Sequence, residues 1–307
     1  MNCHLIDYFI TVLELSKVKA SLLYQAQCYL GEGPLWHTER NSFFWVDIEG
    51  KRFFEYNFKN QTVQCRKLDY RVSCIVQDSD DNLVLGLEGG IAKYNLETET
   101  LTWLIDVEKE YKKHRCNDGK VDSMGRLWMG TLHMDFDKGA GSLYCLQKDL
   151  TLQKKIGELT ISNGMAWSAD NSRLYFIDSP ERKVQSFLFD ETTGHLDFEK
   201  DVIHIPETLG TPDGMTIDEE GMLWIAHWGG FGVYRWNPQN GELMNKIEIP
   251  VPNVSSCVFG GEDFDHLFIT TARQDLSEQE LKNYPASGDV FWIKLPVKGK
   301  PANKFIF

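Results

Sequence analysis

The sequence predicts an all-β protein, a six-bladed β-propeller with four antiparallel strands in each blade. A short pattern recurs six times: a polar residue, a small residue or Cys, an apolar run, a polar turn and a second apolar run. The second apolar runs begin at intervals of 40 to 49 residues, a spacing that accommodates four short strands per unit. Those runs begin at Phe43, Leu83, Leu127, Leu174, Leu223 and Leu267.

The turns inside the repeats support hairpins, because they are rich in Asp, Asn, Ser and Gly. A strand is predicted over residues 21–28, ahead of the first full unit, and the last unit ends near residues 288–294. We expect the N-terminal strand to complete that last blade, because ring closure removes the exposed edges of an open sheet. A solenoid is the competing architecture, but it would have capped ends and a shorter unit. The sequence therefore predicts one domain over residues 21–307, with residues 1–20 as an N-terminal extension.

Composition disfavours several classes of protein. The formal net charge of −13 argues against a nucleic-acid partner, because phosphate binding requires clustered Lys and Arg. Seven cysteines without a CxxC pair predict buried free thiols rather than disulfides or a thiolate zinc site. The apolar run at residues 5–15 contains Asp7 and Glu14, so neither a signal peptide nor a membrane span is predicted. We expect a cytoplasmic protein without a membrane partner, and a closed propeller needs no second subunit to bury its edges.

The first strand of each blade lines the central channel, so the residues that open these strands form a ring at one mouth. That ring is Glu32, Ser73, Asp118, Asn163, Asp213 and Ser256. Carboxylates this close repel one another unless a cation lies among them. Oxygen ligands suit Ca²⁺, Mg²⁺ or Mn²⁺, and Zn²⁺ also accepts carboxylates. The alternative is that these polar residues only cap strand starts. Their matching repeat positions favour a metal site when Glu32, Asn163 and Asp213 are taken together.

Several long motifs carry a resemblance to a known family. They are LGEGPLW (30–36), WVDIEGK (45–51), RCNDGKVDSMGRLWMGT (115–131), ISNGMAW (161–167), FIDS (176–179), PDGMTIDEEGMLWIAHW (212–228) and SSCVFGG (255–261). With these motifs the sequence resembles the senescence-marker-protein, gluconolactonase and luciferin-regenerating-enzyme family. The resemblance implies a six-bladed propeller whose metal ligands are Glu32, Asn163 and Asp213. It also implies substrate contacts by Arg115, Asn117 and Asp135, the last a shorter acid than the family's glutamate.

The resemblance further implies hydrolysis of a sugar lactone, such as an aldonolactone, to its acid. One divalent cation, Ca²⁺ before Zn²⁺, Mg²⁺ or Mn²⁺, would polarise the lactone carbonyl, and Asp213 would act as general base. Arg115, Asn117 and Asp135 would hold ring hydroxyls, with His133, His227 and Trp228 as weaker candidates for the pocket wall.

Two other functions remain open from sequence. One is a calcium-binding regulatory propeller without turnover, since propellers are common binding platforms. The other is a lactonase or esterase of different substrate, resembling paraoxonase-type or luciferin-regenerating enzymes. Other hydrolase and nucleotide-binding chemistries are disfavoured, because the sequence contains no GxSxG, HExxH, P-loop or GxGxxG motif.

Overall fold

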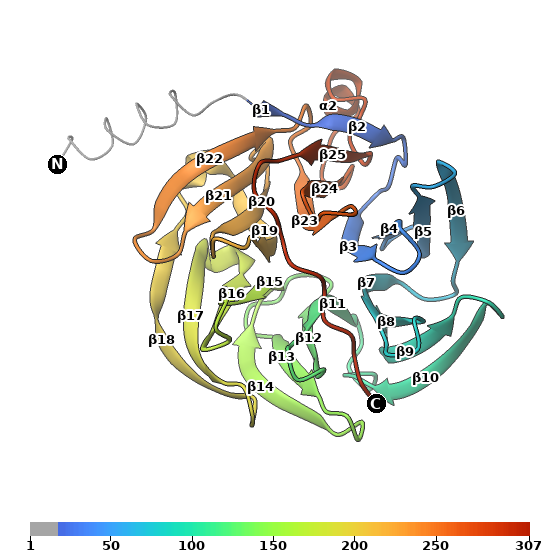
Figure 1. Cartoon of the computed structure of the whole chain (residues 1–307), viewed down its shortest axis with the longest axis vertical. Coiled ribbons are helices and arrows are strands. Elements are labelled where there is room, and N and C mark those ends of the chain that lie inside the picture. Colours follow the sequence, from blue (N-terminus) through green and yellow to red (C-terminus); the bar gives the residue numbers. More distant parts are fainter. Residues whose placement is uncertain (1–17) are drawn as a thin grey trace.

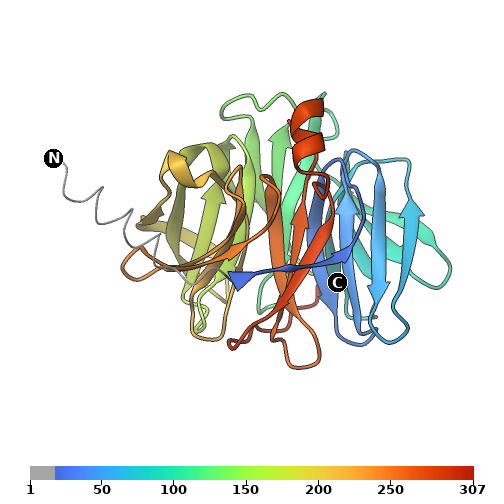
Figure 2. The ribbon, with the colours of Figure 1, turned by 90° about the horizontal axis from the view of Figure 1, so that it is seen from above.

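The computed structural model describes residues 18–307, so the first 17 residues of the predicted extension lie outside the described part of the chain. Six sheets, each with four antiparallel strands, radiate from a central axis, which confirms the predicted six-bladed propeller (Figure 1). The innermost strand of each blade begins at the same face of the disc, where the ring of polar residues was expected. That face also carries the short helix α2 (Glu278–Asn283), which projects from the disc in Figure 2.

The first three blades each contain four consecutive strands. Blade 1 is β3 (Gly31–His37), β4 (Ser42–Asp47), β5 (Arg52–Asn57) and β6 (Thr62–Lys67). Blade 2 is β7 (Val72–Gln77), β8 (Leu83–Leu87), β9 (Gly90–Asn95) and β10 (Thr100–Asp106). Blade 3 is β11 (His114–Val121), β12 (Leu127–His133), β13 (Gly141–Leu146) and β14 (Leu152–Leu159).

The last three blades include the two N-terminal strands and two 3₁₀ turns. Blade 4 is β15 (Ser162–Trp167), β16 (Arg173–Asp178), β17 (Lys183–Asp190) and β18 (His195–His204), with η1 (Ser179–Glu181) after β16 and η2 (Glu207–Leu209) after β18. Blade 5 is β19 (Thr211–Ile217), β20 (Leu223–Trp228), β21 (Gly232–Asn237), β22 (Glu242–Glu248) and β1 (Val18–Lys19). Blade 6 is β23 (Val254–Gly260), β24 (His266–Thr271), β25 (Val290–Lys294) and β2 (Ser21–Tyr24).

The ring closes as predicted, because β2 pairs antiparallel with β25 and supplies the outermost strand of blade 6. The chain pairs even earlier: Val18 and Lys19, inside the predicted extension, run parallel to β22 as a fifth strand of blade 5. The N-terminal segment therefore joins two neighbouring blades and covers two strand edges that would otherwise face solvent.

The hydrophobic core lies between blades rather than within them, in six clusters that each contain residues of two adjacent blades. Large aromatic side chains fill these interfaces, as when Trp36 of blade 1 stacks on Phe268 of blade 6 at a centroid distance of 5.4 Å. Each blade buries its faces only against its neighbours, so the ring must be complete to be stable.

The C-terminal residues 295–307 cross the axis on the hairpin-turn face, opposite the strand starts (Figure 1). The Gly299 amide donates to the Phe264 carbonyl at 2.8 Å, and the Phe305 amide donates to the Gln77 carbonyl at 2.8 Å. The Phe305 ring is fully buried in the cluster between blades 2 and 3. This segment therefore connects blade 6 to the opposite side of the ring, and the channel site faces only the other mouth.

The six cysteines among the described residues are free thiols; five are buried and Cys65 is exposed. Within residues 18–307, no helix is both long enough and apolar enough to span a membrane. The cytoplasmic location stays a prediction.

Candidate active site

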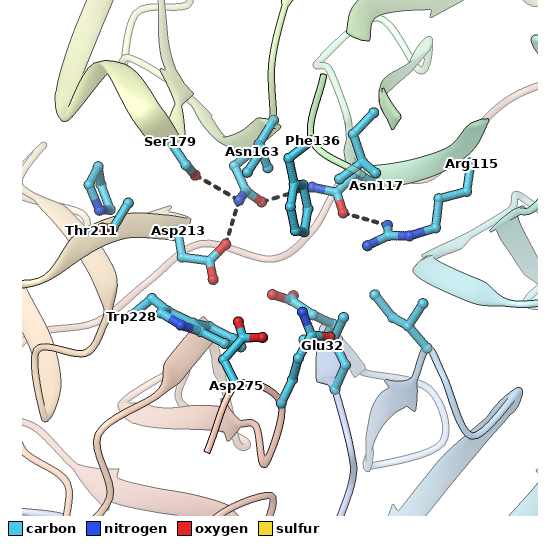
Figure 3. A pocket seen from close by; sticks show the side chains of 16 residues that line it. Glu32, Arg115, Asn117, Phe136, Asn163, Ser179, Thr211, Asp213, Trp228 and Asp275 are labelled. Carbon is cyan, nitrogen blue, oxygen red and sulfur yellow. Dashed lines mark hydrogen bonds between the residues drawn. The ribbon is translucent and has the colours of Figure 1, made fainter. Parts of the chain in front are cut away.

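Glu32, Asn163 and Asp213 each lie where the pairing between the first and second strands of a blade is irregular. The register of β3 on β4 shifts between Glu32 and Leu35, and the register of β19 on β20 shifts between Pro212 and Met215. β15 has the corresponding shift next to Asn163. A bulge leaves its extra residue unpaired and re-aims the side chain. The three side chains, from three different blades, line one pocket at the channel mouth (Figure 3).

The glycine that follows each of these residues is required by close packing around the axis. A Cβ on Gly164 would lie 2.6 Å from the carbonyl oxygen of Asp213, on the neighbouring inner strand. In the Asn-Gly and Asp-Gly dipeptides of the repeat, the first residue directs its side chain toward the axis. The second residue must be Gly, because a side chain there would clash with the neighbouring inner strand. This packing explains why the pattern of a polar residue followed by a small one marks the channel.

Four of the six predicted site residues form one continuous hydrogen-bonded chain. The Arg115 Nη1 donates to the Asn117 Oδ1 at 2.6 Å, and the Asn117 Nδ2 donates to the Asn163 Oδ1 at 3.2 Å. The Asn163 Nδ2 in turn donates to the Asp213 Oδ1 at 2.5 Å and to the Ser179 Oγ at 2.9 Å. Figure 3 shows these bonds running across the pocket from Arg115 to Asp213. Arg115, Asn117, Asn163 and Asp213 are all buried.

The carboxyl groups in this ring are electrostatically strained. Burial raises the pKa of Asp213 well above its usual range, and the nearby charge of Asp118 raises it further. Burial and the charges of Asp213 and Asp118 likewise raise the pKa of Glu32. Burial lowers the pKa of Arg115 to about 10. The protein alone thus leaves negative charge in this pocket largely uncompensated, a condition that a bound cation relieves.

These residues fit a hard divalent cation. Two carboxylates and an amide supply oxygen donors of the kind that Ca²⁺ and Mg²⁺ prefer. Within residues 18–307 no three His, Cys, Asp or Glu side chains converge closely enough to hold a metal, so the third donor would be the amide oxygen of Asn163. In the structure the amide nitrogen faces Asp213, and Asn163 would have to turn its oxygen inward to act as a ligand.

Asp135 is not brought together with the other predicted residues. Its side chain is 54% exposed and pairs with the Lys113 ammonium, outside the pocket. Its neighbour Phe136, whose φ is 59°, lines the pocket instead. The loop after β12 therefore presents an aromatic ring to the site where sequence predicted a carboxylate.

The three weaker candidates for the pocket wall fall into two groups. Trp228 lines the pocket. The His227 ring is fully buried behind it, bonded to the Leu209 carbonyl at 2.8 Å and stacked on Tyr234 at 4.0 Å. His133 also lies outside the pocket lining, with its Nδ1 3.4 Å from the Asp137 carboxylate.

The pocket has a volume of about 180 Å³ and includes residues that the sequence reasoning missed. The missed polar and aromatic residues are Phe136, Ser179, Thr211, Gln274 and Asp275. Their signal was positional, since Ser179 directly follows β16 and Asp275 lies four residues beyond the end of β24. The end of each second strand returns to the mouth, and the few residues beyond it also reach the pocket.

Comparison with known proteins gives a consistent result. The family model described as SMP-30/Gluconolactonase/LRE-like region matches residues 30–273 of this chain. Regucalcin of Oryctolagus cuniculus is 34% identical over 293 residues, which covers 94% of this chain and 98% of that protein. YvrE of Bacillus subtilis (strain 168), provisionally named a sugar lactone lactonase, is 33% identical and covers 88% of this chain and 92% of its own length. The crystal structure of regucalcin from Agrobacterium tumefaciens str. C58, described as a calcium-binding protein, aligns with a TM-score of 0.91 and 25% identity over 95% of this chain and 100% of that one.

Proposed function

We propose that this chain, which belongs to the SMP-30/gluconolactonase/LRE-like family, is a metal-dependent hydrolase that opens a sugar lactone to its free acid. Membership of the family supports a lactonase-type hydrolase, and the sugar lactone comes from the name of the Bacillus relative. The metal dependence and Asp213 as general base are finer proposals, which rest on the chemistry of the pocket.

The observation that carries the proposal is the pairing of two different environments in one pocket. On one side Glu32 and Asp213 present carboxyl groups whose pKa values burial and neighbouring carboxylates raise by more than the charge of Arg115 lowers them. On the other side, the buried guanidinium of Arg115 and the amide of Asn117 offer hydrogen-bond donors. A purely structural ion needs the first environment alone. A hydrolase needs both, because the substrate must be oriented next to the group that activates water.

Each residue then has a distinct task. Arg115 and Asn117 would donate hydrogen bonds to ring oxygens and fix the orientation of the lactone. Asp213 would accept a proton from the attacking water while the water oxygen bonds to the carbonyl carbon of the lactone. The ring C–O bond would then break, and the leaving oxygen would take from Asp213 the proton that Asp213 accepted, which gives the hydroxy acid. A divalent cation held by Glu32, Asn163 and Asp213 would polarise the carbonyl and stabilise the negative charge that develops on its oxygen.

The test is an assay of the full chain on a panel of γ- and δ-lactones, sugar-derived and simple, with Ca²⁺, Zn²⁺, Mg²⁺ or Mn²⁺ supplied in turn. We expect the wild type to open sugar lactones and Asp213→Ala to lose at least about 10²–10⁴-fold in kcat, the usual contribution of a general base. The matched control is Ser73→Ala, which changes a buried residue at the equivalent ring position that does not line the pocket. Full activity in Asp213→Ala would refute the role of that residue.

The alternative function is a calcium-binding regulatory propeller without turnover, favoured by the description of the Agrobacterium relative as calcium-binding. Calorimetric titration of the metal-free chain with Ca²⁺ separates the two. A chain that binds Ca²⁺ and opens no lactone with any of the four ions supports the regulatory alternative. Hydrolysis confined to simple lactones would instead indicate an esterase of different substrate.

A further inference from the structure

Asp275 lies in a tight turn just after β24, in a position that aims its side chain into the pocket. It lines the same pocket as Glu32 and Asp213. Figure 3 shows it beside Trp228, with its carboxylate directed toward the space below Asp213. The backbone of Asp275 has a φ of 63°, in the left-handed region that Asp and Asn tolerate better than most residues.

The turn that carries Asp275 is anchored on both sides. The amides of Arg273 and Gln274 both donate to the Tyr29 carbonyl at 2.9 Å, and the Asn253 Nδ2 donates to the Gln274 carbonyl at 2.8 Å. Two residues later, Ser277 begins α2 with a capping box to Glu280. These bonds tie the turn to the segment before blade 1, so Asp275 is held at the mouth by the backbone.

The Asp275 carboxylate itself takes no part in that anchoring. Among the described residues, no side chain or backbone amide donates a hydrogen bond to it. Other aspartates at the mouth behave differently: Asp47 accepts from Arg52 at 2.8 Å, and Asp178 accepts from the Ile161 amide at 2.8 Å. Asp47 and Asp178 therefore have structural hydrogen-bond partners. Asp275 has none among the described residues, and its carboxylate faces the pocket.

The charge of the pocket lining makes this free carboxylate consequential. Arg115 is the single cationic side chain among the described residues that line the pocket, against the carboxylates of Glu32, Asp213 and Asp275. The lining therefore carries a formal net charge of −2. A divalent cation would bring the loaded pocket to neutrality, and without Asp275 the loaded pocket would be positive.

We propose that Asp275 determines specificity by charge: it favours neutral lactones, disfavours lactones that carry a further carboxylate, and weakens binding of the acid product. This inference rests on the proposed function. The reaction converts a neutral substrate into an anion, so a fixed negative charge in the lining of the pocket discriminates between the substrate and the product. Asp275 is exposed, so solvent screens its charge, and a unit charge a few ångströms from the ligand then changes affinity by about tenfold.

The experiment compares wild type and Asp275→Asn, an isosteric change that keeps a residue tolerant of left-handed backbone. Each is assayed on a neutral aldonolactone and on an aldarolactone of the same ring size that bears a second carboxylate. We expect Asp275→Asn to raise kcat/KM for the anionic lactone about tenfold relative to the neutral one, with a smaller ratio at high salt. Calorimetry with the hydroxy acid should show about tenfold tighter binding to the variant.

The control is Asp197→Asn, which removes the same unit charge from an exposed position on β18 and should change neither ratio. An unchanged substrate ratio and unchanged acid affinity in Asp275→Asn, while the neutral lactone is still opened, overturns the inference and leaves the proposed function standing. If neither lactone is opened by wild type, the proposed function fails, and the calorimetric arm still decides whether Asp275 opposes anion binding.

Discussion

Two aspartates at opposite ends of one inner strand, Asp213 and Asp218, behave as opposites. Both are buried, one near the start of β19 and the other just past its end. The Asp218 carboxylate accepts hydrogen bonds from Trp224 Nε1 at 2.9 Å, from Arg235 Nε at 2.8 Å and from two backbone amides. Asp213 accepts one side-chain hydrogen bond, from the Asn163 amide, and lies among negative charges.

The difference separates a structural carboxylate from one that is available to a ligand. The far end of β11 is built like the far end of β19, since Asp122 accepts from Arg126 at 2.7 Å and from Trp128 at 2.8 Å, whereas Asn117 of the same strand lines the pocket. Several hydrogen-bond donors around a buried carboxylate offset the cost of removing it from water. A buried carboxylate with few donors is instead stabilised when a cation or a ligand binds to it. The channel thus has one end built for stability and one end built for binding.

The largest expected effect on stability comes from Asp218→Asn. Its side chain would turn an amide toward the Trp224 and Arg235 donors and leave Arg235, which is 12% exposed, without its buried partner. Removing one partner of a buried ion pair destabilises a fold by about 3–5 kcal/mol. Urea unfolding should show that loss, and lactonase activity per folded molecule should persist. If Asp218→Asn unfolds at the wild-type urea concentration, the division between the two ends is wrong.

A second test uses the buried His227 behind the pocket. Burial lowers the pKa of His227 to about 3, from an ordinary value of 6.5. The unfolded chain therefore binds a proton that the folded chain refuses, and stability falls as the pH drops below about 6.5. At pH 5 the loss is about 2 kcal/mol, from 1.5 pH units at 1.36 kcal/mol each.

His227→Gln should be less stable than wild type at pH 7, because the stacking on Tyr234 is lost, yet flatter between pH 7 and 5. Urea midpoints at the two pH values measure this slope. The exposed His195 gives the control, since His195→Gln should leave the slope unchanged. Parallel pH curves for wild type and His227→Gln would show that another group causes the acid sensitivity.

A smaller effect of opposite sign is expected for Asp213→Asn in the metal-free protein. Because the pKa of Asp213 is raised in the folded state, the folded chain holds the carboxyl proton more tightly than the unfolded chain, in which the pKa of this group is near 3.8. Stability of wild type should therefore fall as the pH rises above about 4, and removal of the charge should reduce this fall. Thermal midpoints with a chelator between pH 5 and 8 test it, and identical curves for the two proteins would contradict the electrostatic strain.

The sequence predicted the ring and its closure because both follow from repetition. A polar residue followed by Gly at equivalent points of the repeats identifies the channel, as Asn163-Gly164 and Asp213-Gly214 illustrate. The last blade lacked a strand, and β2 supplied it. These features need only local pattern and the geometry of a closed ring.

The remaining residues of the site were not predictable in the same way. Phe136 and Asp275 lie in loops outside the repeat, and their φ angles of 59° and 63° are set by tertiary anchoring rather than by propensity. The sequence indicated the turn aspartates only as hairpin formers, yet the Asp122 and Asp218 carboxylates accept hydrogen bonds from Trp and Arg side chains that follow them in the chain. Side-chain partners across a turn leave little trace in hydrophobic pattern.

The smallest expected effect tests how much the C-terminal segment contributes to the closed end of the channel. The Lys304 ammonium lies 2.6 Å from a Glu39 oxygen and 2.7 Å from an Asp81 oxygen, with its side chain 34% exposed. Burial opposes ionisation of Glu39, but hydrogen bonds from Lys304 and Gln77 prevail and lower its pKa to about 2. That stabilisation is present above pH 4.5 and is lost as the pH falls toward 2.

Lys304→Ala should lower stability at pH 7 by about 0.5–1 kcal/mol, the scale of a partly exposed ion-pair network. Lys298→Ala, which removes a single exposed pair at 3.5 Å, is the control and should have no measurable effect. Equal unfolding midpoints for Lys304→Ala and Lys298→Ala at pH 7 would mean that the C-terminal segment is held by Phe305 and its backbone pairing alone, without a contribution from the Lys304 ion pairs.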